Sequence, residues 1–262
     1  MGVLNVTPDS FSDGGDFLDP DVAVAHGVRL VEDGAAILDV GGESTRPGAD
    51  PVGVDEELRR VVPVIERLAG DGARAELSID TTKRAVAAAA LQAGARLVND
   101  VSAFRFEPEL AALVAGHGAR CCLMHMLGRP RTMQEDPRYE DVVSEVKSFL
   151  EARLAFAVGE GVPEEHVLLD PGIGFGKTVE HNLELLRRLD EIVALGRPVV
   201  VGTSRKAFLG KLTGGRSERE RLPGTIATNV IAWERGATVF RVHDVAAVVD
   251  ALAVAAATVG RE

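Results

Sequence analysis

The segment ELSIDTTKRAVAAAALQAGARLV, residues 76–98, reads as a complete strand–helix–strand unit. A short apolar run at 76–79 is followed by apolar residues at helical spacing over 83–93, and a second apolar run follows at 96–98. A helix that connects two strands in this way returns the chain to the same end of the sheet, so the two strands lie parallel. The segment therefore predicts an α/β protein with a parallel sheet.

The same alternation extends over the whole chain. Short apolar or β-branched runs predict strands at residues 2–6, 36–40, 76–79, 96–98, 120–124, 167–169, 198–201 and 238–242. Between them, helical spacing of apolar residues is clearest at 22–33, 56–68, 83–93, 139–158, 180–195 and 223–235. Eight strands with helices between them fit a (β/α)8 barrel, and 262 residues is the usual size of one such domain.

A polar residue able to do chemistry ends almost every predicted strand. The set is Asn5, Asp39, Asp80, Asn99, His125, Asp170, Ser204, and Arg241 with His243. Barrel active sites are assembled from the C-terminal ends of many strands, whereas an open doubly wound sheet, the alternative with parallel strands, concentrates its ligands near one switch point. We therefore predict a single TIM-barrel domain over residues 1–262, with long binding loops after the first two strands, at 7–20 and 41–54.

The composition excludes several classes of partner. A formal net charge of −11 argues against general binding to nucleic acid or to anionic membranes. No apolar stretch reaches transmembrane length, and no charged-then-apolar leader precedes the first motif. The two cysteines, Cys121 and Cys122, are adjacent in an apolar run, which is typical of buried core thiols in a reducing compartment. We expect a cytoplasmic protein.

A glycine-rich segment, DPGIGFGKT at 170–178, is similar to a nucleotide-binding P-loop at its end only. The P-loop pattern requires glycine five positions before Gly176, where this chain has Pro171. The alternative is a turn that presents Asp170 and lets a flat ring approach the glycines and Phe175 closely. An aspartate there can accept paired N–H bonds from a guanidine-like edge of a heterocycle.

Cations and hydroxyls follow the last two predicted strands. Gly202, Ser204 and Lys206 lie where a strand ends and a helix opens, and free backbone N–H groups at such a point favour a carboxylate or a phosphate. A Schiff-base lysine is the competing role for Lys206. Arg241 and His243 alternate along the last strand and so share one side, which indicates an anion site because phosphate sites in barrels favour the last two strands.

The remaining polar residues have two interpretations each. Asp80 and the pair Asn99–Asp100 could bind heterocycle nitrogens, or could cap the helices that follow them with the help of Thr81. Asn5 could offer its amide oxygen to a metal or its NH₂ group to a phosphate, or could form a turn. For His125, a structural role is at least as well supported as a catalytic one.

Taken in order, these motifs resemble the dihydropteroate synthase family. The resemblance rests on residues 5–15, 42–48 (GESTRPG), 78–81, 99–102, 124–134, 170–177, 203–206 and 241–245, which span nearly the whole chain. It implies a TIM barrel, usually a homodimer and a target of sulfonamides. The implied reaction joins 6-hydroxymethyl-7,8-dihydropterin diphosphate to p-aminobenzoate, with Mg²⁺.

The resemblance also implies roles for single residues. Pterin binding would fall to Asp80, Asn99, Asp170, Phe175, Gly202 and Lys206; p-aminobenzoate binding to Thr45, Arg46, Pro47 and Ser204; and diphosphate binding to Asn5, Arg241 and His243. Asn5 would also bind the Mg²⁺. Among these, the implied catalytic residues are Asp80, Lys206, Arg241 and His243.

Two alternative functions share the pterin-binding residues. A pterin-dependent methyltransferase needs neither paired diphosphate donors at the last strand nor the STRP sequence of the second loop. A catalytically silent paralogue tends to lose the first loop, which is intact here at residues 5–15. One departure from the family stands out, because its members usually carry a strand or hairpin before the first motif. We therefore expect a less well covered barrel floor.

Overall fold

Parallel strands and helices alternate along the chain in the computed structural model, which describes residues 1–7, 20–44, 50–70, 72 and 74–260. The strands coincide closely with the predicted ones: β1 (Gly2–Asn5), β2 (Ile37–Gly41), β3 (Glu76–Asp80), β4 (Leu97–Asp100), β5 (Arg120–Met124), β6 (Val167–Asp170), β7 (Val200–Val201) and β8 (Val239–Phe240). Of the two expected loops, the one at 7–20 lies almost wholly outside the described residues, whereas the one at 41–54 is described except for residues 45–49.

The strands pair in parallel in sequence order. β1 to β6 form one sheet and β7 pairs with β8 in a second. Single parallel bridges connect the two sheets at both sides, Leu169 with Val199 and Gly2 with Val242. At the second junction, the Val3 N–H donates to the carbonyl of Val242 over 3.0 Å. The chain therefore forms the expected (β/α)8 TIM barrel. At the two junctions between the sheets, the strands pair over fewer residues than elsewhere in the barrel.

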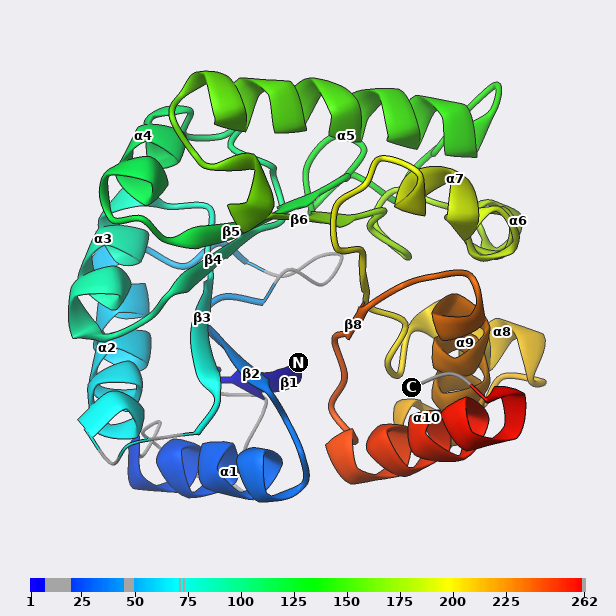
Figure 1. The fold of residues 1–262 in the computed structure, drawn as a ribbon, viewed down its shortest axis with the longest axis horizontal. Coiled ribbons are helices and arrows are strands. Elements are labelled where there is room, and N and C mark those ends of the chain that lie inside the picture. The colour runs from blue at the N-terminus through cyan, green and yellow to red at the C-terminus, as the bar shows by residue number, and fades with distance from the viewer. Residues whose placement is uncertain (8–19, 45–49, 71, 73, 261–262) are drawn as a thin grey trace.

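Helices surround the strands on the outside (Figure 1). In chain order they are α1 (Pro20–Glu32), α2 (Val54–Gly70), α3 (Arg84–Ala93), α4 (Glu109–Gly116), α5 (Val142–Gly159), α6 (Val179–Arg187), α7 (Leu189–Val193), α8 (Ala207–Leu212), α9 (Leu222–Glu234) and α10 (Val245–Val259). Short 3-10 helices also lie at Glu164–His166 and Glu218–Glu220. Within the described residues, no helix is both long and apolar enough to cross a membrane.

One helix prediction was wrong. Residues 180–195 were expected to form a single helix, but the helix is interrupted at Arg188, which has φ −110° and ψ 28°. The guanidinium of Arg188 donates to Asp141, the residue that caps α5, and to Glu191 in α7. The Arg188 side chain thus holds the interruption against the start of α5, through a residue that lies 47 positions away in the sequence.

Alternation along the strands gives the barrel a separate inner core. Leu97, Cys122, Leu168 and Val200, from four consecutive strands, form a buried cluster of their own. Cys121 faces the opposite way and packs in the larger core. Both cysteines are buried and free, as predicted. Two residues beyond three of the inner positions come Asn99, Asp170 and Gly202, so the inner cluster lies directly beneath polar groups.

Candidate active site

Side chains from the first four strands end at one level of the barrel. The parallel register aligns Asn5 with Gly41, Gly41 with Asp80, and Asp80 with Asn99. Gly41 keeps the space between its neighbours open: a Cβ there would lie 3.7 Å from both the Asn5 Oδ1 and the Asp80 Oδ2. The amide oxygen and the carboxylate therefore face one gap at the C-terminal end of the strands.

Arg241 joins this group from the last strand. Its Nε donates to the Asp39 Oδ2 over 2.6 Å, and its Nη2 donates to the Asp80 Oδ2 over 2.7 Å. Asp39 is fully buried and also accepts hydrogen bonds from Ser78 Oγ (2.6 Å) and Asn99 Nδ2 (2.9 Å). Asp39 thus orients two of the predicted ligand-binding residues, Asn99 and Arg241.

Burial governs the charges in this group. It raises the pKa of Asp80 from 3.8 to about 7, because desolvation of the carboxylate outweighs the attraction of Arg241. Burial also opposes the charge on Arg241, but the carboxylates of Asp39 and Asp80 overcome it and raise the pKa of that guanidinium. Arg241 is therefore a permanent cation, while Asp80 can carry or release a proton near neutral pH.

A second group forms around the glycine-rich turn. The Asp170 Oδ1 accepts from the Gly172 N–H over 2.6 Å, and burial raises the pKa of that carboxyl group. The Nζ of Lys206 donates to the carbonyl of Ile173 and lies 4.6 Å from the centre of the Phe175 ring. Burial lowers the pKa of Lys206 from 10.5 to about 8, although Asp170 opposes this shift.

Two glycines of the turn lie too close to neighbouring residues to carry a side chain without strain. Gly172 has φ +67°, and a Cβ there would lie 1.8 Å from the carbonyl oxygen of His125. Gly174 has φ +83°, and a Cβ there would lie 3.1 Å from the Lys206 side chain. The glycines therefore let the turn pack closely against the residue that follows β5 and against Lys206.

Ser204 and His243 connect the last two strands. The Ser204 Oγ and the His243 Nδ1 are 3.0 Å apart, and the His243 N–H donates to the same Oγ over 3.2 Å. The intervening Arg205 takes the left-handed conformation (φ 58°), and its guanidinium pairs with Asp244. A Cβ on Gly202 would lie 3.8 Å from the Lys206 Nζ and 3.9 Å from the Arg241 Cβ, so Lys206 and Arg241 border the same space.

Other predicted polar residues have structural roles. Asp100 is fully buried, and its two oxygens accept the N–H groups of Ser102 and Phe104. Thr81 accepts the Lys83 N–H just before α3. Neither residue caps the following helix, the structural role that the sequence left open for them: Asp100 binds within a turn that precedes α4, and neither α3 nor α4 has a side-chain cap hydrogen bond.

The structural role of His125 is also favoured, and the sequence did not single out the lysine beside it. The His125 Nδ1 lies 2.9 Å from the Lys177 Nζ, and both side chains are buried. Burial lowers the pKa of His125 to about 2 and lowers that of Lys177 well below 10.5. Lys177 also donates to the Phe175 carbonyl over 3.0 Å, so Lys177 connects His125 to the glycine-rich turn.

Thr45, Arg46 and Pro47 lie outside the described residues. The predicted residues that the structure brings to the barrel end are Asn5, Asp80, Asn99, Asp170, Phe175, Gly202, Ser204, Lys206, Arg241 and His243. Asp39 was recognised only as a strand-end residue and received no role, although it is the acceptor common to Arg241 and Asn99.

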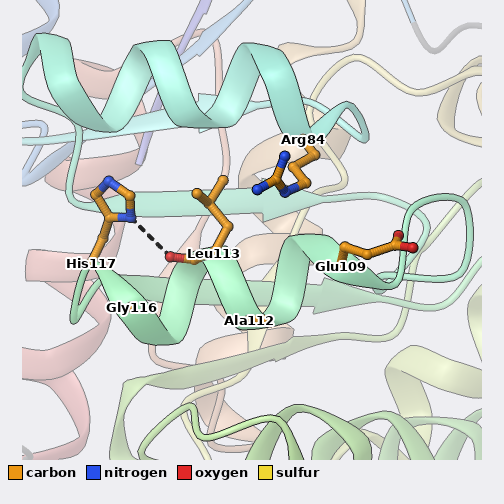
Figure 2. A pocket seen from close by; sticks show the side chains of 6 residues that line it. All are labelled: Arg84, Glu109, Ala112, Leu113, Gly116 and His117. Carbon is orange, nitrogen blue, oxygen red and sulfur yellow. Dashed lines mark hydrogen bonds between the residues drawn. The ribbon is translucent and has the colours of Figure 1, made fainter.

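A hollow of about 680 Å³ lies elsewhere, on the outside of the barrel. It is lined by residues of α4, by His117 just after that helix and by Arg84 at the start of α3 (Figure 2). The Nδ1 of His117 is hydrogen-bonded to the carbonyl of Leu113 at 2.9 Å. The hollow lacks the buried, convergent polar groups found at the strand ends. We therefore take the strand ends, and not this hollow, as the candidate site.

Comparison with known proteins gives one consistent answer. A family model described as pterin binding enzyme matches residues 1–243. The dihydropteroate synthase of Mycobacterium leprae is 51% identical over 263 residues, which cover 98% of this chain and 92% of that protein. The solved structure of Xanthomonas albilineans dihydropteroate synthase with 4-aminobenzoic acid superposes with a TM-score of 0.93 at 49% identity, covering 100% of this chain and 93% of that one.

A Yersinia pestis dihydropteroate synthase solved as a complex with a sulfonamide drug has a TM-score of 0.93 at 44% identity, with 99% of this chain and 93% of that chain covered. These relatives match over both the sheet that carries the carboxylates and the strands that carry the cations.

Proposed function

The chain belongs to the pterin-binding enzyme family, and from this premise we propose how its strand-end site performs the dihydropteroate synthase reaction. The reaction condenses 6-hydroxymethyl-7,8-dihydropterin diphosphate with p-aminobenzoate to 7,8-dihydropteroate, a step of folate biosynthesis, and the chain is accordingly a transferase. The names of its relatives favour neither of the two alternatives, the methyltransferase and the silent paralogue.

The pterin ring is proposed to bind between the two groups of the site. Asp80, Asn99 and Asp170 offer oxygen acceptors and an amide at the C-terminal end of their strands, which suits the N–H-rich edge of a pterin. Lys206, which donates to the carbonyl of Ile173 and is attracted by the charge of Asp170, is the donor for the ring's acceptor atoms. Phe175 and Gly202 flank the ring, and neither presents a side-chain polar group.

The leaving group is proposed to bind to Arg241, His243 and Asn5. The observation that carries this proposal is the position of Arg241, a permanent cation in direct contact with the carboxylate of Asp80. As the C–O bond breaks, its electron pair stays with the diphosphate, whose growing charge Arg241 and His243 stabilise. The methylene gains positive character shared with the pterin, and the carboxylate of Asp80 opposes that charge.

The acceptor amine completes the reaction. The nitrogen lone pair of p-aminobenzoate forms the new C–N bond, and the ammonium so formed loses a proton to water or to the departing diphosphate. The carboxylate of p-aminobenzoate is proposed to lie near Ser204, at the opening of α8, with Thr45, Arg46 and Pro47 as further contacts. Because the amine attacks in its neutral form, the reaction needs no strong general base.

Mg²⁺ is proposed as the cofactor, with Asn5 as a ligand. Asn5 Oδ1 and Asp80 Oδ2 face the same gap beside Gly41, and oxygen donors of this kind suit a hard cation. Among the described residues, no group of three or more His, Cys, Asp or Glu side chains could hold a metal alone. This fits a site that takes one or two oxygens from the protein and the rest from a diphosphate. When bound, the ion neutralises charge on the diphosphate.

A homodimer in the cytoplasm is proposed on separate grounds. Apolar side chains are exposed on α9 and α10, including Ile231 (43%), Val254 (67%) and Val259 (48%), and such a face is typical of an interface between subunits. The buried free thiols favour a reducing compartment. Sedimentation equilibrium of the purified protein tests the first proposal, and cell fractionation tests the second.

The deciding experiment is diphosphate release from the purified protein with Mg²⁺, pterin diphosphate and p-aminobenzoate, each omitted in turn. Release that requires all three supports the proposed roles. Tight pterin binding without release would refute them in favour of the silent paralogue. Release that persists in excess EDTA would remove Mg²⁺ from the proposal.

A further inference from the structure

Three charged residues behind the second loop have no part in the site described above. Lys83, immediately before α3, donates through its Nζ to the Glu43 Oε2 over 2.5 Å and to the Glu57 Oε2. Glu43 follows β2, and Glu57 lies in the first turn of α2. The side chain of Glu57 is fully buried, and that of Lys83 is only 17% exposed.

The same residues join the two ends of the second loop. The Glu43 Oε1 accepts the N–H of Val52 over 3.0 Å, so one carboxylate contacts the chain before and after the intervening segment. Beside it, Arg60 of α2 donates to the carbonyl of Gly42 over 2.8 Å. Lys83 neutralises the carboxylate of Glu43 and connects it to Glu57 in α2.

This arrangement is poorly suited to a purely stabilising role. The Glu57 Oε1 is buried without a hydrogen-bond partner, although the other oxygen is paired with Lys83, and an unsatisfied buried polar atom costs stability. Buried ion pairs are often no more stabilising than apolar residues of the same size. What such a pair does provide is a fixed position for the segments that it joins, which here are the second loop, α2 and the turn after β3.

We propose that Lys83 is a positioning residue that, through Glu43 and Glu57, fixes both ends of the second loop and thereby sets the KM for p-aminobenzoate. The inference rests on the proposed function, in which residues of this loop contact the acceptor. Lys83 itself contacts no substrate. It lies three positions after Asp80, so one short turn connects the pterin-binding strand to the position of the acceptor loop.

The kinetic test compares Lys83→Met with a matched control, Arg120→Met. Arg120 pairs with Glu76 over 2.6 Å and is 33% exposed, against 17% for Lys83, and both Arg120 and Glu76 lie at the first residues of their strands, at the opposite end of the barrel. For Lys83→Met we expect the KM for p-aminobenzoate to rise about tenfold while the KM for pterin diphosphate changes less than twofold. Arg120→Met should change neither, and Lys83→Arg should restore most of the loss. Equal shifts in both KM values, or the same pattern in Arg120→Met, would overturn the inference.

A second measurement is independent of turnover. Amide hydrogen exchange at Val52 reports its bond to Glu43 directly, and the Val6 N–H, bonded to Gly41 over 2.7 Å, is the reference. In both Lys83→Met and Glu43→Gln we expect Val52 to exchange at least tenfold faster, with Val6 unchanged. Unchanged exchange at Val52 would refute the positioning role. A wild-type protein that releases no diphosphate would instead refute the proposed function, and the exchange data would still decide the role of Lys83.

Discussion

Replacing Arg241 with methionine separates the two roles that the structure gives to this side chain. Methionine keeps much of the apolar stem but removes the guanidinium that contacts Asp39 at 2.6 Å and Asp80 at 2.7 Å. Asp80 can respond by taking up a proton, because its pKa is already raised to about 7. Asp39 is fully buried and would lose its only cationic partner among the described contacts.

The expected loss of stability follows from the burial of Asp39. Removing one member of a buried ion pair leaves an uncompensated charge and costs about 3–5 kcal/mol. For a domain of this size, that corresponds to a fall in Tm of roughly 6–20 °C. Turnover should fall by about 10²–10³, the usual effect of losing one preorganised donor to a developing anion.

The assay is urea unfolding followed by circular dichroism, together with steady-state diphosphate release, for Arg241→Met and for Arg241→Met combined with Asp39→Asn. The second substitution removes the uncompensated charge, so we expect it to recover most of the lost stability and none of the lost turnover. Recovery of turnover in the double variant would show that Arg241 acts only by neutralising Asp39. A loss of less than about tenfold in turnover for the single variant would refute the role of Arg241 at the diphosphate.

Three further predictions address single groups of the site. Asp80→Asn should make the unfolding free energy depend less on pH. The raised pKa of Asp80 gives the wild type a stabilising contribution that is present below pH 3.8 and lost as pH rises through about 7. The fall in unfolding free energy between pH 5 and 8 should therefore be smaller in the variant, and equal slopes would contradict the assignment. Lys206→Met should raise the KM for pterin diphosphate. It should also remove a rise of the unfolding free energy with pH, because the lowered pKa of Lys206 gives the wild type a stabilising contribution that is present above pH 10.5 and lost as pH falls through about 8. Urea unfolding of both proteins at pH 7.5 and 10 measures this difference. Gly172→Ala should lower the unfolding free energy by at least about 3 kcal/mol, because the new Cβ would collide with the His125 carbonyl. The control Gly118→Ala, at φ +59° with open space around it, should lose only about 1–2 kcal/mol. Similar losses in the two variants would show that the turn at Gly172 relaxes.

Much of this architecture follows from local patterns. Residues 76–98 already contained the repeating unit, and the polar residue at each strand end marked the correct end of the barrel. The interruption at Arg188 was beyond the pattern, because the side chain there contacts Asp141, the N-cap residue of α5, which lies 47 positions away. Local spacing continues smoothly through that position.

The role of Asp39 illustrates a second limit. In the sequence it is one aspartate among several at strand ends. Its distinction arises only when β3, β4 and β8 bring Ser78, Asn99 and Arg241 to the same carboxylate. Lys177 was similarly hidden, because the P-loop-like sequence around it drew attention to the glycines and its partner His125 lies 52 positions away.

The two junctions between the sheets separate the acidic residues of the site from the cationic ones. The six-stranded sheet carries the acidic members Asp39, Asp80 and Asp170, while the cationic members Lys206 and Arg241 arrive with β7 and β8. Without the last two strands, Asp39 and Asp80, whose charges repel, would lack the guanidinium of Arg241 that pairs with both. Docking of the last two strands relieves that repulsion in the same step that completes the site. Attraction between substrate-binding residues therefore helps the chain to close its ring, and a molecule whose ring has not closed lacks the cations needed to hold a diphosphate.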